Sequence, residues 1–328
     1  MTPTASRSVV VLGASGFLGR HVCAAFAAAG ARVSPVSRKA RDGVALDLVR
    51  AGRPELRRLC AGADAVVNAA GAVWGGTGQE MAELNAELVR RLTEVLAELP
   101  ERPRFVNLGS AYEYGPVPAG VSIDEDWPPA PATAYGRTKL QGTQAVVRAA
   151  DEHGVDGVAL RVSVACGPGT PKVSLPGIVA GHLAAGDDEL RLAPLRAHRD
   201  LVDVRDVADA VLAAADAPRG AVAGAVINIG GGAAVPVRDL VELMISLSGR
   251  PVRIVEEAVA RDTRSDAQWQ RLDIGRARRT LGWTPRRTLA ESMRDLLTAV
   301  GVPVVRPVPA VQPAEGTEDE PTARAHPR

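Results

Sequence analysis

The sequence predicts an α/β fold, a doubly wound parallel sheet followed by a smaller C-terminal α/β lobe, and two observations support this. Short apolar runs alternate with alanine- and leucine-rich helical stretches through the first half of the chain, a pattern typical of parallel sheets covered by helices. After about residue 165 the chain turns to longer loops rich in glycine and proline, such as CGPGTPKVSLPG. This change indicates a second, smaller unit.

The individual elements follow from local periodicity. Apolar residues recur at helical spacing over 18–30 and 81–99, which predicts two helices. Short runs rich in valine predict buried strands between and after them. These runs are residues 9–12, 32–36, 65–68, 104–108 and 158–164.

The same pattern divides the chain into four segments. Residues 1–7 form a short tail, and residues 8–165 form the sheet domain, to which the chain returns from its second half. Residues 166–301 mainly form the lobe. Residues 302–328 are heavy in proline and lack periodicity, so we expect a disordered tail there.

Composition excludes several classes of protein. Lys and Arg total 39 against 38 for Asp and Glu, and they are scattered, so we expect no nucleic-acid surface. The three cysteines and five histidines lack the spacing of a disulfide framework or a metal site. No apolar run reaches the roughly 20 residues of a membrane helix, and the N-terminus has no apolar signal core. We therefore expect a cytoplasmic protein without membrane contact.

A glycine-rich turn, GASGFLG, follows the first apolar run directly. Gly13 permits a sharp turn, Gly16 lets the backbone approach a pyrophosphate, and Gly19 lets the next helix pack close to the sheet. The alternative is a turn that serves packing alone. The interpretation as a pyrophosphate-binding turn predicts a Rossmann-type NAD(P)-binding domain. Its expected phosphate contacts are Gly13, Ser15, Gly16, Phe17, Leu18 and Gly19.

The end of the second strand favours NADP(H) over NAD(H). An NAD site would place an acidic residue there for the ribose hydroxyl, whereas this chain has Ser37, Arg38 and Lys39. Arg38 can bind a 2′-phosphate with two hydrogen bonds, and a solvated basic turn is the alternative. Two further stretches, LDL and NAAG, are expected to line the adenine edge and the cofactor backbone, at Asp47 and Leu48 and at Ala69, Ala70 and Gly71.

A serine, a tyrosine and a lysine form the candidate catalytic group. Tyr135 and Lys139 in YGRTK are four residues apart and share one helix face. A lysine cation beside a phenol lowers the phenol pKa from about 10 toward neutrality, as a general acid or base requires. Ser110 follows the strand RFVNLG, so its hydroxyl can hold a substrate oxygen at the strand end. The alternative is an ordinary surface helix.

Taken in order, GASGFLG, NAAG, LGSAYEYG and YGRTK resemble the extended short-chain dehydrogenase/reductase superfamily, in its NAD(P)-dependent epimerase/dehydratase branch. The similarity continues through LRVSVACGPG, HRDLVDVRDVADA, INIGGG and LGWTPRRTLAES, and covers about residues 7–300. The resemblance implies that Tyr135 exchanges a proton at a hydroxyl or carbonyl, that Lys139 also binds the nicotinamide ribose, and that Ser110 orients the reacting oxygen while hydride passes to or from the nicotinamide.

The resemblance also implies further roles. Asn85 matches a position that supports the active-site strand, and Arg199 and Arg264 match arginines that approach the diphosphate of a nucleotide-sugar; a salt bridge within the lobe is the alternative for either arginine. Family members usually pair through two helices, one carrying YxxxK, so we expect a homodimer. The expected substrate contacts are Ser110, Ala111, Tyr112, Val164, Arg199 and Arg264.

The residues after Ser110 bear on the reaction. Sugar dehydratases of this superfamily place an Asp-Glu pair there, but this chain has Ala111 and Tyr112, and Glu113 is one position late, on the other face of an extended segment. Dehydration is therefore disfavoured. Ketone reduction and epimerisation remain, and an NADPH-type pocket favours reduction. In size and layout the chain resembles deoxysugar 4-ketoreductases of actinobacterial type.

Two alternatives stay open at this point. Members that bind sugar nucleotides often have Asn in RxxNVYGPG, where this chain has Val164, whose side chain cannot donate a hydrogen bond. A nucleotide-sugar is the expected substrate, and a ketone on another secondary metabolite is the alternative. A cofactor-binding sensor without catalysis is a different class of function, but such proteins commonly lose the Tyr or the Lys, and both are present.

Overall fold

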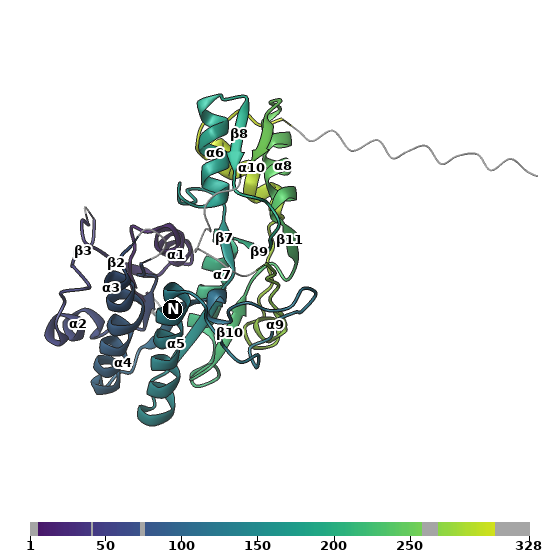
Figure 1. The fold of residues 1–328 in the computed structure, drawn as a ribbon. Coiled ribbons are helices and arrows are strands. Elements are labelled where there is room, and N and C mark those ends of the chain that lie inside the picture. Colours follow the sequence, from purple (N-terminus) through teal and green to yellow (C-terminus); the bar gives the residue numbers. More distant parts are fainter. Residues whose placement is uncertain (1–5, 41, 73–75, 258–267, 306–328) are drawn as a thin grey trace, which may run out of the picture.

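A computed structural model of the chain describes residues 6–40, 42–72, 76–257 and 268–305. Its centre is a seven-stranded sheet in the order β10-β6-β5-β4-β1-β2-β3, and every neighbouring pair is parallel (Figure 1). The predicted doubly wound parallel sheet is therefore confirmed. The strands are β1 (Ser8–Leu12), β2 (Arg32–Ser37), β3 (Val44–Ala45), β4 (Ala65–Asn68), β5 (Arg104–Ser110), β6 (Gly157–Val162) and β10 (Val226–Ile229).

Helices bury both faces of this sheet. In β1, Val9 and Val11 pack in the core that contains α1 and α7, whereas Val10 and Leu12 pack in the core that contains α2, α4 and α5. Because alternate side chains of a strand point to opposite faces, a strand buried on both sides is apolar throughout. The helices are α1 (Phe17–Ala28), α2 (Arg53–Cys60), α3 (Gly78–Ala82), α4 (Leu88–Glu98), α5 (Ala134–His153), α7 (Val204–Asp216) and α9 (Gly275–Leu281).

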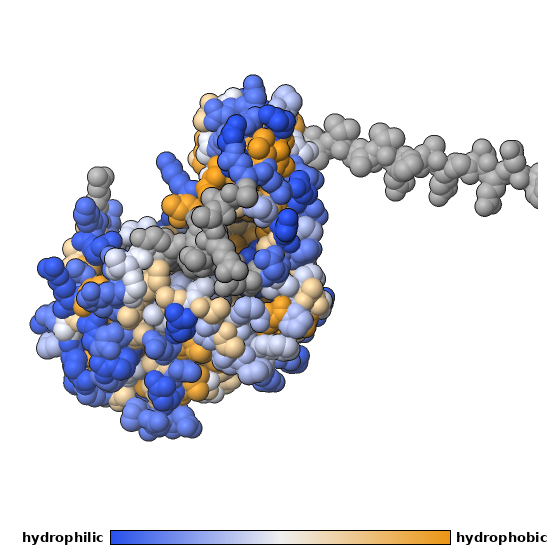
Figure 2. Space-filling view, viewed as in Figure 1, coloured by the Kyte–Doolittle hydropathy of each residue, from blue (hydrophilic) through white to orange (hydrophobic). Residues whose placement is uncertain are grey.

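The lobe has its own apolar core and rises from one side of the sheet domain (Figure 1). Figure 2 shows the surface hollowed where the two parts meet. One three-stranded sheet, β11-β9-β7, adjoins the sheet domain, and a two-stranded sheet, β12-β8, lies farther out. The elements are β7 (Val164–Cys166), α6 (Leu175–Ala185), β8 (Glu189–Leu192), β9 (His198–Asp203), β11 (Ala234–Pro236), α8 (Val237–Ser248), β12 (Arg253–Glu256) and α10 (Leu289–Ala299).

Two predicted elements differ from the structure. The run 158–164 is two strands, because β6 ends at Val162 and β7 pairs with β9 of the lobe. Ser163 lies between them, and its N–H still donates to the carbonyl of Ile229, the last residue of β10. The helix expected over 81–99 is interrupted by a π-helical turn, Glu83–Glu87, and such turns occur frequently at functional sites.

The structure also contains elements and contacts that the sequence did not predict. Helix α2 and the short strand β3 had no predicted counterpart. At the C-terminal end, Val302 is buried in the lobe core and the N–H of Val305 donates to the carbonyl of Leu247. Residues 302–305, which the sequence assigned to the tail, therefore pack on the lobe.

The outer strands of the main sheet are short or covered. At one edge, β3 has two residues. At the other, the N–H of Asn228 in β10 donates to Glu125 at 2.8 Å, and the carbonyl of Val226 accepts from Arg276 at 3.3 Å. Glu125 and Arg276 lie 3.4 Å apart, so an ion pair covers this strand.

Within the described residues, no helix is long and apolar enough to cross a membrane.

Candidate active site

Ser110 is the last residue of β5, at the carboxyl end of the parallel sheet, where ligands bind in such folds. It caps a 3-10 turn, Ala111–Glu113, and its Oγ accepts the N–H of Tyr112 at 3.2 Å. Only 5% of its surface is exposed. The serine hydroxyl is thus fixed by the strand on one side and the turn on the other.

Helix α5 brings Tyr135 and Lys139 to this serine. Thr133 caps the helix by accepting the N–H of Gly136 at 3.0 Å, so Tyr135 lies in its first turn. The side chains of Tyr135 and Ser110 are hydrogen-bonded. Lys139 is buried, and its Nζ donates to the carbonyl of Leu108 in β5 at 2.9 Å. The three predicted catalytic residues therefore come together, while their role remains a proposal.

The pKa values differ from one expectation. Burial raises the pKa of Tyr135 to about 12; its hydrogen bond with Ser110 opposes the shift, and Tyr112 and Glu113 add to it. Burial likewise lowers the pKa of Lys139 to about 8. The expectation that Lys139 lowers the tyrosine pKa is not met here: Lys139 is not among the groups that shift this pKa, and its amine donates to the carbonyl of Leu108 in β5. At neutral pH Tyr135 is a protonated phenol, which is a proton donor.

The glycine turn leaves no space for side chains. Gly13 has φ +74°, and a Cβ on it would lie 2.6 Å from the backbone nitrogen of Ala70. A Cβ on Gly19 would meet the Gly13 carbonyl oxygen. Gly16 precedes α1, whose first turn contains Phe17, Leu18, Gly19 and Arg20. A helix N-terminus that has the cation Arg20 in its first turn, and glycines whose backbone no side chain covers, fits the pyrophosphate of a dinucleotide.

The loop after β4 connects the glycine turn to Lys139. Asn85, buried in the π-helical turn, accepts the N–H of Ala72 at 3.1 Å and donates to the Ala72 carbonyl at 3.0 Å and to Thr138 of α5 at 3.1 Å. A Cβ on Gly71 would lie 3.0 Å from Asn85 Oδ1 and 3.1 Å from Lys139 Nζ. The residues expected along the cofactor backbone, Ala69, Ala70 and Gly71, thus border both the glycine turn and Lys139.

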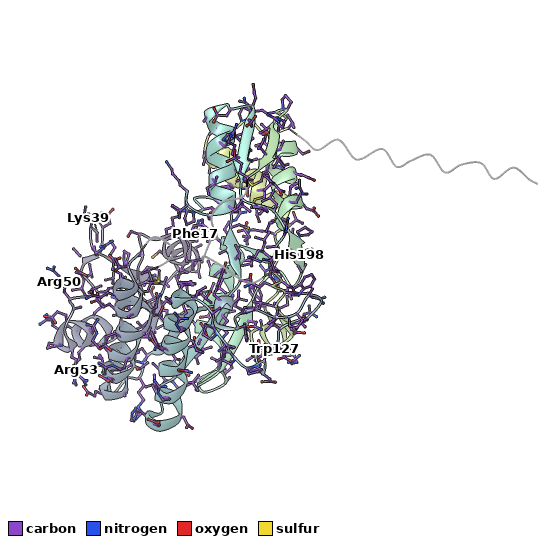
Figure 3. The ribbon with its side chains drawn as sticks, viewed as in Figure 1. Phe17, Lys39, Arg50, Arg53, Trp127 and His198 are labelled. Atoms are coloured by element: carbon purple, nitrogen blue, oxygen red, sulfur yellow. The ribbon has the colours of Figure 1, made fainter. Side chains whose placement is uncertain are left out.

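The end of β2 presents the residues expected at the adenosine end. Ser37 is buried, while Arg38 and Lys39 are exposed, and Figure 3 shows Lys39 on the outer side of the sheet domain. Asp47 is half-buried and its carboxylate accepts the N–H of Val49 at 3.1 Å. The side chain of Leu48 packs in the sheet-domain core.

Two residues expected to contact the substrate, Val164 and Arg199, lie on strands of the lobe. Val164 of β7 is aligned with Leu201 of β9 and is half-buried against the lobe core. Arg199, also on β9, is aligned with Val235 of β11, and its guanidinium donates to the His198 carbonyl at 2.9 Å. Figure 3 shows Phe17 of α1 close to the point where the lobe begins. Arg264 lies outside the described residues.

Comparison with known proteins identifies the family. The model of the NAD dependent epimerase/dehydratase family matches residues 9–230. The chain belongs to this family. The resemblance found in the sequence is therefore confirmed, and with it an NAD(P)-dependent enzyme.

Two relatives of this chain carry the names of enzymes that act on nucleotide-sugars. A dTDP-6-deoxy-L-talose 4-dehydrogenase (NAD(P)(+)) from Kitasatospora kifunensis is 44% identical over 90% of this chain and 96% of its own length. A GDP-6-deoxy-D-mannose reductase from Pseudomonas aeruginosa is 26% identical over 89% of this chain and 97% of its own.

Solved structures share the fold. The structure of RMD from Pseudomonas aeruginosa complexed with NADPH has a TM-score of 0.79 at 24% identity and covers 90% of this chain and 99% of its own. A UDP-glucuronic acid 4-epimerase from Bacillus cereus, in complex with UDP-glucuronic acid and NAD, has a TM-score of 0.78 at 20% identity, with 89% and 98% covered. At these sequence identities, the similarity to the two solved structures shows the fold of this chain and nothing further.

Sequence reasoning assigned Glu113 an orientation but missed its contacts. It expected an extended segment, whereas residues 111–113 form a 3-10 turn that directs the carboxylate into the protein. Glu113 is fully buried and pairs with Arg161 of β6 at 2.8 Å. The carboxylate therefore points into the protein, whereas the sequence placed it on the other face of an extended segment. The spacing Ser110-x-x-Glu113, which matches a capping box, was the available signal.

Two other contacts were missed because they join residues far apart in the chain. Arg20 of α1 donates to the carbonyl of Gly169 at 2.7 Å, and His21 lies 3.0 Å from the Pro168 carbonyl, so helix α1 is tied to the first loop of the lobe. Asp200, fully buried, accepts N–H groups of Gly231, Gly232 and Leu272. Among the described residues there is no cluster of metal-ligating side chains.

Proposed function

We propose that this protein reduces the C4 ketone of a nucleotide-linked deoxysugar with NADPH. The observation that carries the proposal is the hydrogen-bonded pair of Ser110 and the protonated phenol of Tyr135, with Lys139 one helical turn beyond. The 44% identical relative, named a 4-dehydrogenase of a dTDP-6-deoxysugar, supports the same reaction, because oxidation of a C4 alcohol is the reverse of C4 ketone reduction.

In this proposal each residue has one task. The nicotinamide, when bound, supplies the hydride that reduces the ketone carbon. Ser110 Oγ donates to the ketone oxygen and orients it, and the phenol of Tyr135 gives that oxygen its proton as the alcohol forms. General acid catalysis of this kind contributes about 10²–10⁴-fold. Lys139, beside the loop at Gly71, holds the nicotinamide ribose and provides a positive charge next to the tyrosinate that remains.

We propose NADP(H) as the preferred cofactor because of the charges at the end of β2. Ser37 offers a hydroxyl and the exposed Arg38 a guanidinium, whereas an NAD site would use a carboxylate at this place. A guanidinium forms two parallel hydrogen bonds with a phosphate. The relative named for NAD(P)(+) supports use of the phosphorylated cofactor without deciding the preference.

We propose a division of labour between the two parts of the chain. Residues 8–165 bind the cofactor and residues 166–301 mainly bind the substrate, with Arg199 and Arg264 at the diphosphate and Val164 in contact with the ligand. We also propose a cytoplasmic homodimer that pairs through two helices, one of them α5. Light scattering on the purified protein measures the oligomeric state directly, and a monomer at micromolar concentration would contradict that part.

The deciding experiment follows NADPH and NADH absorbance while the purified protein reacts with a dTDP-linked 4-keto-6-deoxyhexose, and resolves the products by chromatography and NMR. We expect NADPH to be consumed in proportion to a new hydroxyl at C4. An inverted configuration without cofactor consumption would instead establish an epimerase. No change in sugar or cofactor would reject the nucleotide-sugar substrate and leave a ketone of another metabolite.

A further inference from the structure

The carboxylate of Glu113 is bonded on both oxygens. Oε1 accepts the backbone N–H of Ser110 at 2.8 Å and the hydroxyl of Thr143 at 3.0 Å, and Oε2 accepts from Nε of Arg161 at 2.8 Å. Charge-assisted hydrogen bonds of this kind are short and strong inside a protein. Because the side chain has no exposed surface, Glu113 is held in one orientation inside the protein.

The donors come from the two elements that carry the catalytic residues. Ser110 ends β5, and Thr143 lies on α5 four residues after Lys139 and eight after Tyr135. Residues at this spacing share one helix face. The same face also touches β5 through the hydrogen bond from Lys139 to the carbonyl of Leu108. Through Ser110 and Thr143, Glu113 thus fixes the end of β5 against the face of α5.

The strand leaves space for this carboxylate. A Cβ on Gly109 would lie 2.6 Å from Oε1 of Glu113, closer than real side-chain carbons come, and 3.0 Å from Oγ1 of Thr143. A glycine directly before Ser110 is therefore needed for the carboxylate to enter. The contact is part of how the strand end is built.

Glu113 also acts on the charge of Lys139. Its negative charge raises the pKa of Lys139, against the lowering caused by burial. Arg161, the ion-pair partner of Glu113, is not among the charges that shift this pKa. Glu113 of the turn is the charged group that acts on Lys139. Tyr135 lies one turn earlier on α5 and Arg161 of β6 is bonded to Glu113, while the π-helical turn and the loop after β4 present the neutral Asn85 and Gly71.

We propose that Glu113 is a positioning residue of the site: it holds Ser110 against the face of α5 that carries Tyr135 and Lys139, and it supplies the negative charge facing Lys139. The identity of the reaction rests on the proposed function, but these contacts do not depend on which substrate binds. Removing the charge while keeping the shape therefore changes the protonation of Lys139 in the protein alone.

The test uses Glu113→Gln and follows lysine titration by NMR. The chain contains three lysines, Lys39, Lys139 and Lys172, so protein labelled with ¹³C at lysine Cε gives three signals. Lys39 and Lys172 are exposed and serve as internal references. In Glu113→Gln we expect the titration midpoint of Lys139 to fall by about one pH unit. The signal that vanishes in Lys139→Met assigns the resonance.

Glu125→Gln is the matched control. Glu125 is also a buried carboxylate that accepts a backbone N–H and faces an arginine, but its partners are Asn228 and Arg276 at the sheet edge. We expect this variant to leave the Lys139 midpoint unchanged. With substrate, we expect kcat to fall about tenfold and KM to stay within about twofold in Glu113→Gln, and neither to change in Glu125→Gln.

A buried arginine without its partner can prevent folding. If Glu113→Gln does not fold, the double variant Glu113→Gln/Arg161→Gln removes both charges, and the Lys139 midpoint is again expected to fall, because the charge that raises it is lost. An unchanged midpoint in a folded variant overturns the proposal. Since the titration needs neither substrate nor cofactor, an error in the proposed function leaves this result intact.

Discussion

The two walls of the candidate site are held in different ways. On the sheet-domain wall, Gly13 and Gly19 touch backbone atoms, and the polar side chains around Ser110 are buried and bonded to one another. In the outer part of the lobe, β8 and β12 are flanked by ion pairs of exposed side chains, such as Arg191 with Glu257. Buried and mutually bonded groups tolerate little change, whereas exposed ion pairs at the outer lobe tolerate more. We therefore call the first region the rigid wall and the outer lobe the adaptable wall, and under the proposed function the catalytic residues lie on the rigid one.

The largest effect is expected for Tyr135→Phe on the rigid wall. The variant loses the proton donor, so kcat for ketone reduction should fall about 10²–10⁴-fold. Stopped-flow NADPH absorbance measures this. Tyr112→Phe is the control, because the Tyr112 ring packs edge-on against Tyr135 at 5.8 Å and is expected to cost less than tenfold. If Tyr135→Phe kept more than about a tenth of kcat, Tyr135 would not be the acid.

Gly13→Ala should destabilise the fold itself. The new Cβ meets the backbone of Ala70 at 2.6 Å, and the positive φ adds strain, so we expect a loss of about 2–4 kcal/mol in the free energy of unfolding. Gly120→Ala separates the two causes, because Gly120 also has a positive φ, +90°, but open space around it. Urea unfolding of both variants tests this, and equal losses would show that the close approach costs nothing.

Lys139 should make stability depend on pH in a defined window. Its folded pKa, about 8, is below the ordinary 10.5, so between these values the unfolded chain binds more protons and the native state gains stability as pH rises. Relative to Lys139→Met, the wild type should gain about 1–3 kcal/mol from pH 7.5 to 10. Burial raises the pKa of Cys60 to about 12, which opposes this above pH 9, but Cys60 is present in both proteins and cancels. A constant difference would contradict the buried amine.

Arg38→Ala should weaken NADPH binding about tenfold through the lost phosphate contact and leave NADH binding unchanged. Fluorescence titration with both cofactors measures this. Arg50→Ala is the control, since Arg50 is an exposed arginine of the same side of the molecule (Figure 3). Equal weakening of both cofactors would place Arg38 outside the 2′-phosphate site.

The smallest effect is expected on the adaptable wall. The side chain of Arg191 is 64% exposed and forms ion pairs with Glu189 and Glu257, and Arg191→Ala removes both pairs. Surface pairs contribute about 0–1 kcal/mol, and the difference should shrink further at high salt. A loss above about 2 kcal/mol in thermal unfolding would show that the outer lobe is held as firmly as the sheet domain.

What could be predicted from the sequence was local. Valine runs identify strands such as 9–12 because both faces of the strand are buried. The glycine turn is recognisable because Gly19 packs against the backbone of the same turn and Gly13 packs against the backbone that follows the neighbouring strand β4. The approach of Ser110 to Tyr135 could be predicted because a strand end and the helix N-terminus after it meet at one edge of a parallel sheet.

The rest depends on distant partners. The break at Ser163 depends on the pairing of Val164–Cys166 with residues 201–203 of β9, and the contact of Arg20 with Gly169 spans 149 positions. The pKa of Tyr135 could not be predicted from the spacing of Tyr135 and Lys139, because its shift comes from burial, Ser110 and the Tyr112–Glu113 turn, and Lys139 is not among these causes.

The edges of the main sheet bear on the behaviour of many copies of this protein together. An edge strand exposes a row of N–H and C=O groups that can template a strand of another molecule. Here β3 is too short to offer such a row, and the ion pair of Glu125 and Arg276 binds one outward N–H and one C=O of β10, at Asn228 and Val226. The sheet therefore ends within each molecule, and its apolar strands can form a large core without inviting aggregation.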